Sequence, residues 1–197
     1  MAKYYYLIAT LPTLTSDSNQ FMSSESFLEL CRRWLSRRDL HLVESTVVSF
    51  AAPQVKQEKA VVNRILQHWQ AFETQLRNAL VRQRALKQKR DPAAFLRETE
   101  QFGAAVGGEW LVQGVRAAIQ QENPLTAEQM LNNLRWHYLD ELERGQFFTV
   151  EFLQVYYLKL QILERSAQFL FEQGEAHFQQ AYAAAAKQLQ GVAAIQL

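Results

Sequence analysis

Apolar residues recur every three to four positions along most of the chain, which is the spacing of an amphipathic helix. The longest such pattern covers residues 54–90, is broken only at Gln83, and approaches a heptad repeat. We therefore expect a long helix that packs lengthwise against another helix, as in an antiparallel hairpin. Its stripe comprises Val62, Ile65, Trp69, Phe72, Leu76, Ala79 and Leu86.

A second pattern, in residues 134–165, predicts two helices joined at Gly145. The second of these helices is apolar nearly all round, because only Gln154, Lys159 and Gln161 are strongly polar between residues 152 and 163. A helix with so small a polar face is normally buried. Buried charges are costly unless they are paired, so we expect an ordered charge set in this hairpin. Its candidate members are Arg135, Asp140, Glu141, Lys159, Glu164 and Arg165.

Three roles are open for these charges: a structural clamp, a surface that docks a partner, and a catalytic site. Arg135 and Asp140 are five positions apart and pair poorly along one helix. We expect Arg135 to meet Glu164, and Lys159 to meet Asp140 or Glu141, across the hairpin. Asp140 and Glu141 are adjacent and diverge by about 100° on a helix, so they do not form a facing carboxylate pair. The pattern favours ion pairs that fix helix register, with partner docking as the alternative.

Start and stop signals divide the rest of the chain into further helices. Residues 4–11 are apolar and predict a buried first helix or a strand, while the β-branched residues 41–50 are ambiguous and compatible with a loop. Gly145 ends one helix and Thr149 begins the next. The remaining predicted helices cover residues 24–38 after the cap at Ser23 and Ser24, 93–102 after Asp91-Pro92, 109–121, 126–142 after a capping box at Thr126, and 149–173.

The composition agrees with an all-α fold, because the chain of 197 residues has an apolar content of 48% and few glycines (7) and prolines (4). We predict an antiparallel helical bundle with one long helix pair, forming a single domain over residues 1–197 with a possible subdivision near residue 91. Residues 1–90 carry 14 Lys and Arg against 7 Asp and Glu, whereas residues 91–197 carry 7 against 13. This asymmetry suggests either a molecule that orients itself between different neighbours or two halves that pair with each other.

The residue types that usually carry chemistry form no recognisable motif. The four histidines are far apart and form no helical pair at metal-ligand spacing, and phosphate-loop, dinucleotide and nucleophile-elbow motifs are absent. The single Cys31 lies in an apolar helical pattern and is expected to be a buried thiol, which favours a reducing, cytosolic setting. We therefore predict no catalytic residue, no metal site and no cofactor, and a protein that is not an enzyme.

Nucleic-acid and membrane partners are also disfavoured by the sequence. The basic residues between positions 77 and 90 spread around their helix, which is typical of a solvated helix end rather than a nucleic-acid surface. The apolar run at residues 4–11 is too short to span a bilayer, and it lacks a signal-peptide cleavage pattern. We expect a protein without a membrane-spanning segment.

Two passages together resemble a known family. They are the opening MAKYYYLIATLP followed by FLELCRRWL, and the later RWHYLDELERGQFFTVEFLQVYYLKLQILER together with RNALVRQRA. The resemblance is to a bacterial family of uncharacterised proteins encoded within operons for V-type (A/V-type) ATPases, in the place where the C subunit would be expected. It covers most of the chain, through about residue 178.

The resemblance implies similarity to the C subunit of V-type ATP synthases, which is called d in eukaryotic complexes. It implies an all-helical, non-enzymatic linker whose partners are the central stalk and the membrane rotor ring. The expected location is cytoplasmic, peripheral on the inner face of the cell membrane through those partners. The chain is much shorter than that C subunit and lacks a clear three-fold repeat. The alternatives are an assembly or regulatory factor for the ATPase and, from another class, a small helical enzyme.

Overall fold

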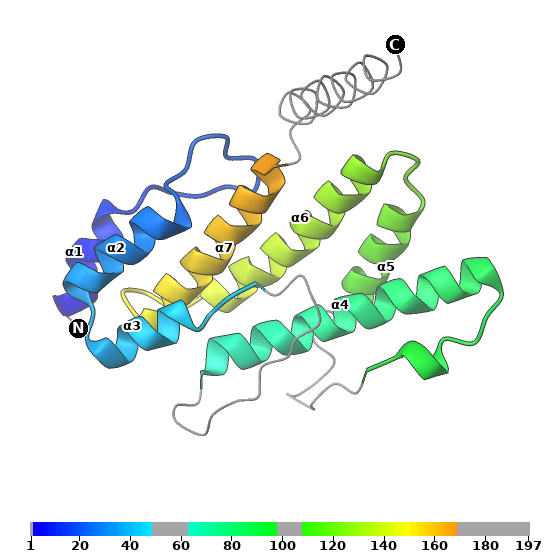
Figure 1. Cartoon of the computed structure of the whole chain (residues 1–197), viewed down its shortest axis with the longest axis horizontal. Helices are drawn as coiled ribbons and strands as arrows, with labels where there is room; N and C mark the ends of the chain where they lie inside the picture. The colour runs from blue at the N-terminus through cyan, green and yellow to red at the C-terminus, as the bar shows by residue number, and fades with distance from the viewer. Residues whose placement is uncertain (1, 49–62, 98–107, 169–197) are drawn as a thin grey trace, which may run out of the picture. The chain divides into compact units, whose positions relative to one another are not determined.

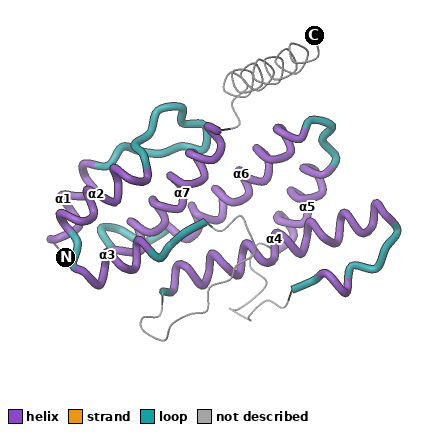
Figure 2. The backbone as a smooth tube through the Cα atoms, in the orientation of Figure 1, coloured by secondary structure: helices purple, strands orange, loops and turns teal. Residues whose placement is uncertain are grey.

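The computed structural model describes residues 2–48, 63–97 and 108–168. Within these residues all regular elements are helices, as Figure 2 shows, which confirms the predicted all-α class. The chain divides into two compact units, Met1–Leu163 and Glu164–Leu197, and the first unit holds the helical bundle. The elements in chain order are α1 (Ala2–Thr10), α2 (Ser24–Trp34), α3 (Arg37–Glu44), α4 (Arg64–Gln88), the 3-10 turn η1 (Ala93–Phe95), α5 (Gly108–Ile119), α6 (Pro124–Glu143) and α7 (Val150–Gln168).

Helix α7 is buried over most of its surface between Leu153 and Leu163, because it lies between two hydrophobic clusters. Val155, Leu158 and Ile162 belong to the cluster that α7 shares with α4, α5 and α6. Leu153, Tyr157 and Leu160 belong to a second cluster with α1, α2 and α3. Figure 1 shows α7 between α2 on one side and α6 on the other. The near absence of a polar face in its sequence therefore reflects two packed faces rather than a membrane environment.

The larger cluster is organised around aromatic residues of α4, α5 and α6. The rings of Phe72 and Tyr138 stack with their centroids 4.2 Å apart, which holds α4 against α6. Helix α5 also packs closely on α6, because a Cβ at Gly114 would overlap the side chain of Leu134. Most of the predicted stripe on α4 is buried here, but Leu86 is 70% exposed, so its predicted core position is wrong. Ala85 is the buried residue in that turn.

The predicted helix over residues 24–38 is instead two helices with a corner between them. Helix α2 begins at Ser24 with Ser23 as its cap, as predicted, but it ends at Trp34. The side chain of Ser36 then accepts a hydrogen bond from the backbone N–H of Asp39 and caps α3. This cap makes the first part of the ambiguous segment 41–50 helical through Glu44.

Two other predicted helix boundaries differ in the structure, and specific hydrogen bonds explain both. The helix predicted over residues 93–102 stops after the 3-10 turn at Phe95. Asn78 of α4 exchanges two hydrogen bonds with the backbone of Arg97, of 2.8 and 3.0 Å, and this holds the chain beyond the turn against α4. Helix α6 begins at Pro124 rather than at the predicted capping box, because Asn123 supplies the cap and proline suits the first helical position.

The smaller cluster contains the chain's one cysteine. Cys31 is fully buried, and burial raises the pKa of its thiol to about 12, which confirms the predicted buried thiol. The predicted first helix is α1, and its Leu7 is buried while Tyr5 and Tyr6 are exposed. No helix in the described part of the chain is long and apolar enough to cross a bilayer.

Some predictions fall on residues outside the described ranges. They are the start of the long helix at residues 54–62 with Val62, the end of the ambiguous segment at 49–50, residues 98–102, and the end of the last helix at 169–173.

Candidate functional site

The most buried charges form an ion pair between α4 and α6. The Nε of Arg135 donates a hydrogen bond to Oε1 of Glu73 across 2.7 Å, and both side chains are buried. Glu73 is among the buried residues of α4, where it lies in the contact with α6. A single buried carboxylate or guanidinium is expensive, and each charge here offsets the cost of burying the other.

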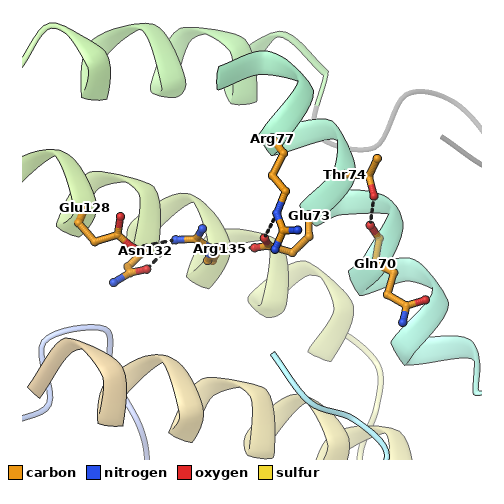
Figure 3. A network of polar contacts seen from close by, with 7 residues as sticks. All are labelled: Gln70, Glu73, Thr74, Arg77, Glu128, Asn132 and Arg135. Carbon is orange, nitrogen blue, oxygen red and sulfur yellow. Dashed lines mark hydrogen bonds and ion pairs between the residues drawn. The ribbon is translucent and has the colours of Figure 1, made fainter. Parts of the chain in front are cut away.

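Three further side chains extend this pair into the network seen in Figure 3. On α6, Arg135 Nη1 donates to Asn132 Oδ1 across 2.8 Å and lies 3.5 Å from Glu128 Oε1. On α4, Arg77 Nε lies 3.6 Å from Oε2 of Glu73. That Oε2 accepts no hydrogen bond from the described residues. Two carboxylates and two guanidinium groups balance in charge, as in a clamp that fixes one helix against another.

A second charge cluster fixes α7 against the end of α6. Lys159 is buried, and its Nζ lies 2.7 Å from Oδ1 of Asp140 and donates a hydrogen bond to Glu143. The same Nζ lies 5.3 Å from the centroid of the Trp136 ring, within cation–π distance. The predicted pairing of Lys159 with Asp140 is confirmed, and Glu143 is a partner that was not predicted.

The other candidate residues have different surroundings. Glu141 is exposed and lies 3.5 Å from His137 on its own helix instead of meeting Lys159. Glu164 and Arg165 lie on α7 and belong to the second compact unit, whereas Arg135 belongs to the first. The pairing of Arg135 with Glu164 stays a prediction.

A third polar cluster joins α7 to the loop after α3. The Nε2 of Gln154 donates hydrogen bonds to Thr46 Oγ1 and Asn63 Oδ1, each across 2.8 Å. Gln161, further along α7 and nearer solvent, accepts a hydrogen bond of 2.9 Å from the backbone N–H of Val48. These bonds satisfy the polar groups of a helix that otherwise packs on apolar side chains. We therefore assign a structural role to both glutamines.

One described cavity combines several ionisable side chains. It has a volume of about 290 Å³ and lies where the start of α4, the end of α6 and the start of α7 meet. Its lining residues are Arg64, Ile65, His68, Leu142, Gln146 and Glu151. These groups could hydrogen-bond a small polar ligand. Among the residues that the structure describes, no group of three or more His, Cys, Asp or Glu side chains is placed to hold a metal ion.

The sequence contains only weak indications of the ion-pair partners that were not predicted. Glu73 lies directly beside the stripe residue Phe72, and a charged residue that is buried is almost always paired. Glu128, Asn132 and Arg135 follow one another at intervals of four and three, the spacing of neighbours on one helix face. Neither pattern indicates which other helix supplies the residue of opposite charge.

Comparison with protein-family models finds a match at residues 112–186 to a family described as "Protein of unknown function (DUF2764)". The chain is similar to that family over less than half its length. The matched region contains α6, the described part of α7, and both Arg135 and Lys159, but the family's description assigns no activity. No curated protein and no solved structure matches the chain.

Proposed function

We propose that the chain is a non-enzymatic component of a bacterial V-type ATPase, a linker similar to the C subunit, between the central stalk and the membrane rotor ring. It would act at the cytoplasmic face of the membrane, held there through the other subunits. The observation that carries the proposal is the resemblance of the α6–α7 hairpin sequence, with the opening helix, to proteins encoded in ATPase operons.

Two structural features support this proposal. The all-helical architecture agrees with the helical fold that the resemblance implies. The buried charges of α4, α6 and α7 are used in pairs between helices, as the short distances of Arg135 to Glu73 and Lys159 to Asp140 indicate. Such pairs stiffen the arrangement of helices and suit a part that transmits force between partners without changing shape.

Copurification from native membranes tests the proposal. A tagged full-length chain should isolate the A, B and D subunits and the rotor ring from detergent-solubilised membranes, in fixed proportion and in the intact complex. Absence of the chain from the intact ATPase would contradict the linker function. A chain found only on incomplete complexes would instead identify an assembly factor.

The cavity at Arg64, His68 and Glu151 favours a second candidate function, a small helical enzyme. An enzyme should be stabilised against heat by some small polar metabolite, and the stabilisation should disappear in His68→Ala and Glu151→Gln. The variants Arg82→Gln and Arg84→Gln, at exposed positions on the same helix α4 as His68, serve as controls. Stabilisation of all four variants alike would count against a ligand in this cavity.

A further inference from the structure

Most of the exposed aromatic residues in the described part of the chain gather at one end of the first unit. Phe147 is 77% exposed, Tyr6 64%, Tyr5 52% and Trp34 50%. Phe148, also exposed, completes the set. Isolated exposed hydrophobic side chains are common on proteins, but a contiguous group of large rings usually marks an interaction surface.

Contacts between segments place the three parts of the chain that carry these rings at the same end of the bundle. The rings of Tyr5 and Phe148 are 5.1 Å apart, which joins α1 to the turn between α6 and α7. The neighbouring Tyr4 donates a hydrogen bond of 2.7 Å to Asp39, which joins α1 to the corner between α2 and α3 where Trp34 lies. Figure 1 shows α1, this corner and the α6–α7 turn at the same end of the bundle. We call this surface, formed by Tyr5, Tyr6, Trp34, Phe147 and Phe148, the aromatic end.

The aromatic end is bordered by arginines that lack acidic partners among the described residues. They are Arg33 in the last turn of α2, Arg37 and Arg38 at the start of α3, and Arg144 at the end of α6, and all four are exposed.

The acids nearby are mostly engaged elsewhere. Asp39 accepts hydrogen bonds from Tyr4 and Ser36, Glu44 pairs with Arg32 at 3.2 Å, and Glu143 binds Lys159. Glu151 is half-buried in the first turn of α7, and Glu141 lies beside His137. Exposed arginines without acidic partners among the described residues therefore border the aromatic rings, alongside the exposed acids Asp140 and Glu141 of α6 and Glu29 of α2.

The turn between α6 and α7 holds two of the rings outward. Its backbone is in the left-handed region at Gly145, with φ +80°, and at Phe148, with φ +56°. This conformation is unfavourable for a bulky residue such as phenylalanine. The fold thus maintains a strained turn that leaves Phe147 as the most exposed large apolar side chain in the described residues.

We propose that the aromatic end binds the surface of an anionic phospholipid bilayer. Phenylalanine enters the acyl boundary, tyrosine and tryptophan rings lie at headgroup level, and arginines meet the lipid phosphates. The aromatic end carries these residue types on the α6–α7 turn, on α1 and at the end of α2, and the arginines lie on α2, α3 and the end of α6. This inference goes beyond the proposed function, because it concerns a direct contact with lipid.

Vesicle cosedimentation of the full chain tests the proposal. The protein should sediment with vesicles of phosphatidylcholine containing phosphatidylglycerol, much less with phosphatidylcholine alone, and less again at high salt. Arg37→Gln with Arg38→Gln should weaken binding about tenfold or more, since each arginine near an anionic surface adds roughly a few-fold in affinity. Phe147→Ser with Tyr6→Ser should weaken binding by a similar factor, about tenfold, through lost apolar insertion.

Matched controls lie elsewhere on the bundle. Arg82→Gln with Arg84→Gln removes the same charge from α4, and Phe95→Ser removes an aromatic ring that is 68% exposed in η1. Both should bind vesicles as the unaltered chain does, and circular dichroism should show that all variants stay folded. In addition, the fluorescence of Trp34 should shift to the blue on anionic vesicles, and Trp34→Phe should abolish that shift.

Three results would overturn the proposal: no binding to anionic vesicles, equal weakening by the control variants, or unaltered binding after the changes at the aromatic end. If vesicles do not bind but the Arg37 and Arg38 changes abolish copurification with ATPase subunits, the surface docks a protein instead. Because copurification is measured separately from vesicle binding, failure of the proposed function and failure of lipid binding are distinguishable.

Discussion

Arg135 and Glu73 place opposite charges inside the contact between α4 and α6, where water cannot screen them. Such a pair contributes little net stability compared with well-packed apolar residues, because both charges must first be desolvated. The pair instead favours one alignment of α4 on α6 over others. A sliding of α4 along α6 by one turn would separate Arg135 from Glu73 and leave two unpaired charges in the interior.

Removal of one partner should therefore be costly. Arg135→Met leaves Glu73 buried with only the more distant Arg77, and we expect the free energy of unfolding to fall by about 3 kcal/mol. Urea unfolding followed by circular dichroism measures this loss. The double variant with Glu73→Met should recover a large part of it, because no uncompensated charge remains.

The exposed pair of Arg32 and Glu44 provides the comparison. Arg32→Met should change the free energy of unfolding by less than about 1 kcal/mol, because solvent screens this pair. If Arg135→Met is as mild as Arg32→Met, the buried pair does not act as a clamp.

Two buried tyrosines predict a loss of stability at alkaline pH. Burial raises the pKa of Tyr138 and of Tyr156 from 10.0 to about 12. Between these two pH values the tyrosines keep their protons in the folded chain but have released them in the unfolded chain. The free energy of unfolding should therefore be unaffected by these groups below pH 10 and should fall as the pH rises toward about 12. Urea midpoints measured across this range should decline, and Tyr156→Phe should make the decline less steep. A flat profile would show that these hydroxyls ionise as easily in the folded chain as in the unfolded one.

The partner of a buried charge was easiest to predict from the sequence where both residues lie in one helical hairpin. Lys159 lies on the helix that follows Asp140 after a short turn, so the sequence predicted a pairing with Asp140 or Glu141 but did not choose between them or indicate Glu143. Glu73 and Arg135 are 62 positions apart, and their pairing depends on how α4 lies against α6. Helix periodicity indicates which side of a helix is buried, but it does not indicate which helix covers that side.

At the scale of elements, most helices were predictable and several ends were not. Apolar periodicity located α2, α4, α5, α6 and α7, since that signal accumulates over many residues. The ends depended on single side chains, such as Ser36, which caps α3, and Asn78, which binds the backbone of Arg97. The second of these contacts joins residues from different elements, and no local pattern reveals it.

The turn between α6 and α7 depends on Gly145, whose φ is +80°. A Cβ at this position would meet no atom within 4 Å, so the cost of a side chain comes from the backbone alone. We expect Gly145→Ala to lower the free energy of unfolding by about 1–2 kcal/mol, and thermal or urea unfolding measures it. Gly145→Asn should cost less, because asparagine tolerates the left-handed region. Equal effects of the two substitutions would mean that the turn changes conformation to accommodate a side chain.

At the scale of the first unit, α7 contributes buried residues to both hydrophobic clusters and so links them. The cluster of α4, α5 and α6 and the cluster of α1, α2 and α3 both include residues of α7, and Leu14 and Phe21 pack against both. Neither cluster is complete without α7. We infer that the two clusters stabilise each other through α7 together with Leu14 and Phe21.

Unfolding of the two clusters should therefore be a single cooperative transition. Trp69, Trp110 and Trp136 lie in or against the larger cluster, and tyrosine and helix signals report on both. Tryptophan fluorescence and circular dichroism should give the same urea midpoint. Leu158→Ala, which is directed at the larger cluster, should lower both midpoints together. A fluorescence transition separate from the circular dichroism transition would show that the clusters unfold independently.

The position of α7 in the chain also affects how the protein is made. Residues 150–163 follow every other described helix of the first unit, so they leave the ribosome last among them. Until then Phe27, Leu139 and other residues that end fully buried lack their covering helix. A growing chain therefore carries two incomplete apolar surfaces after α6 has been made and before α7 follows, and exposed apolar surface of this kind recruits chaperones. Truncation before α7 should yield a chain that aggregates, however well its earlier helices form.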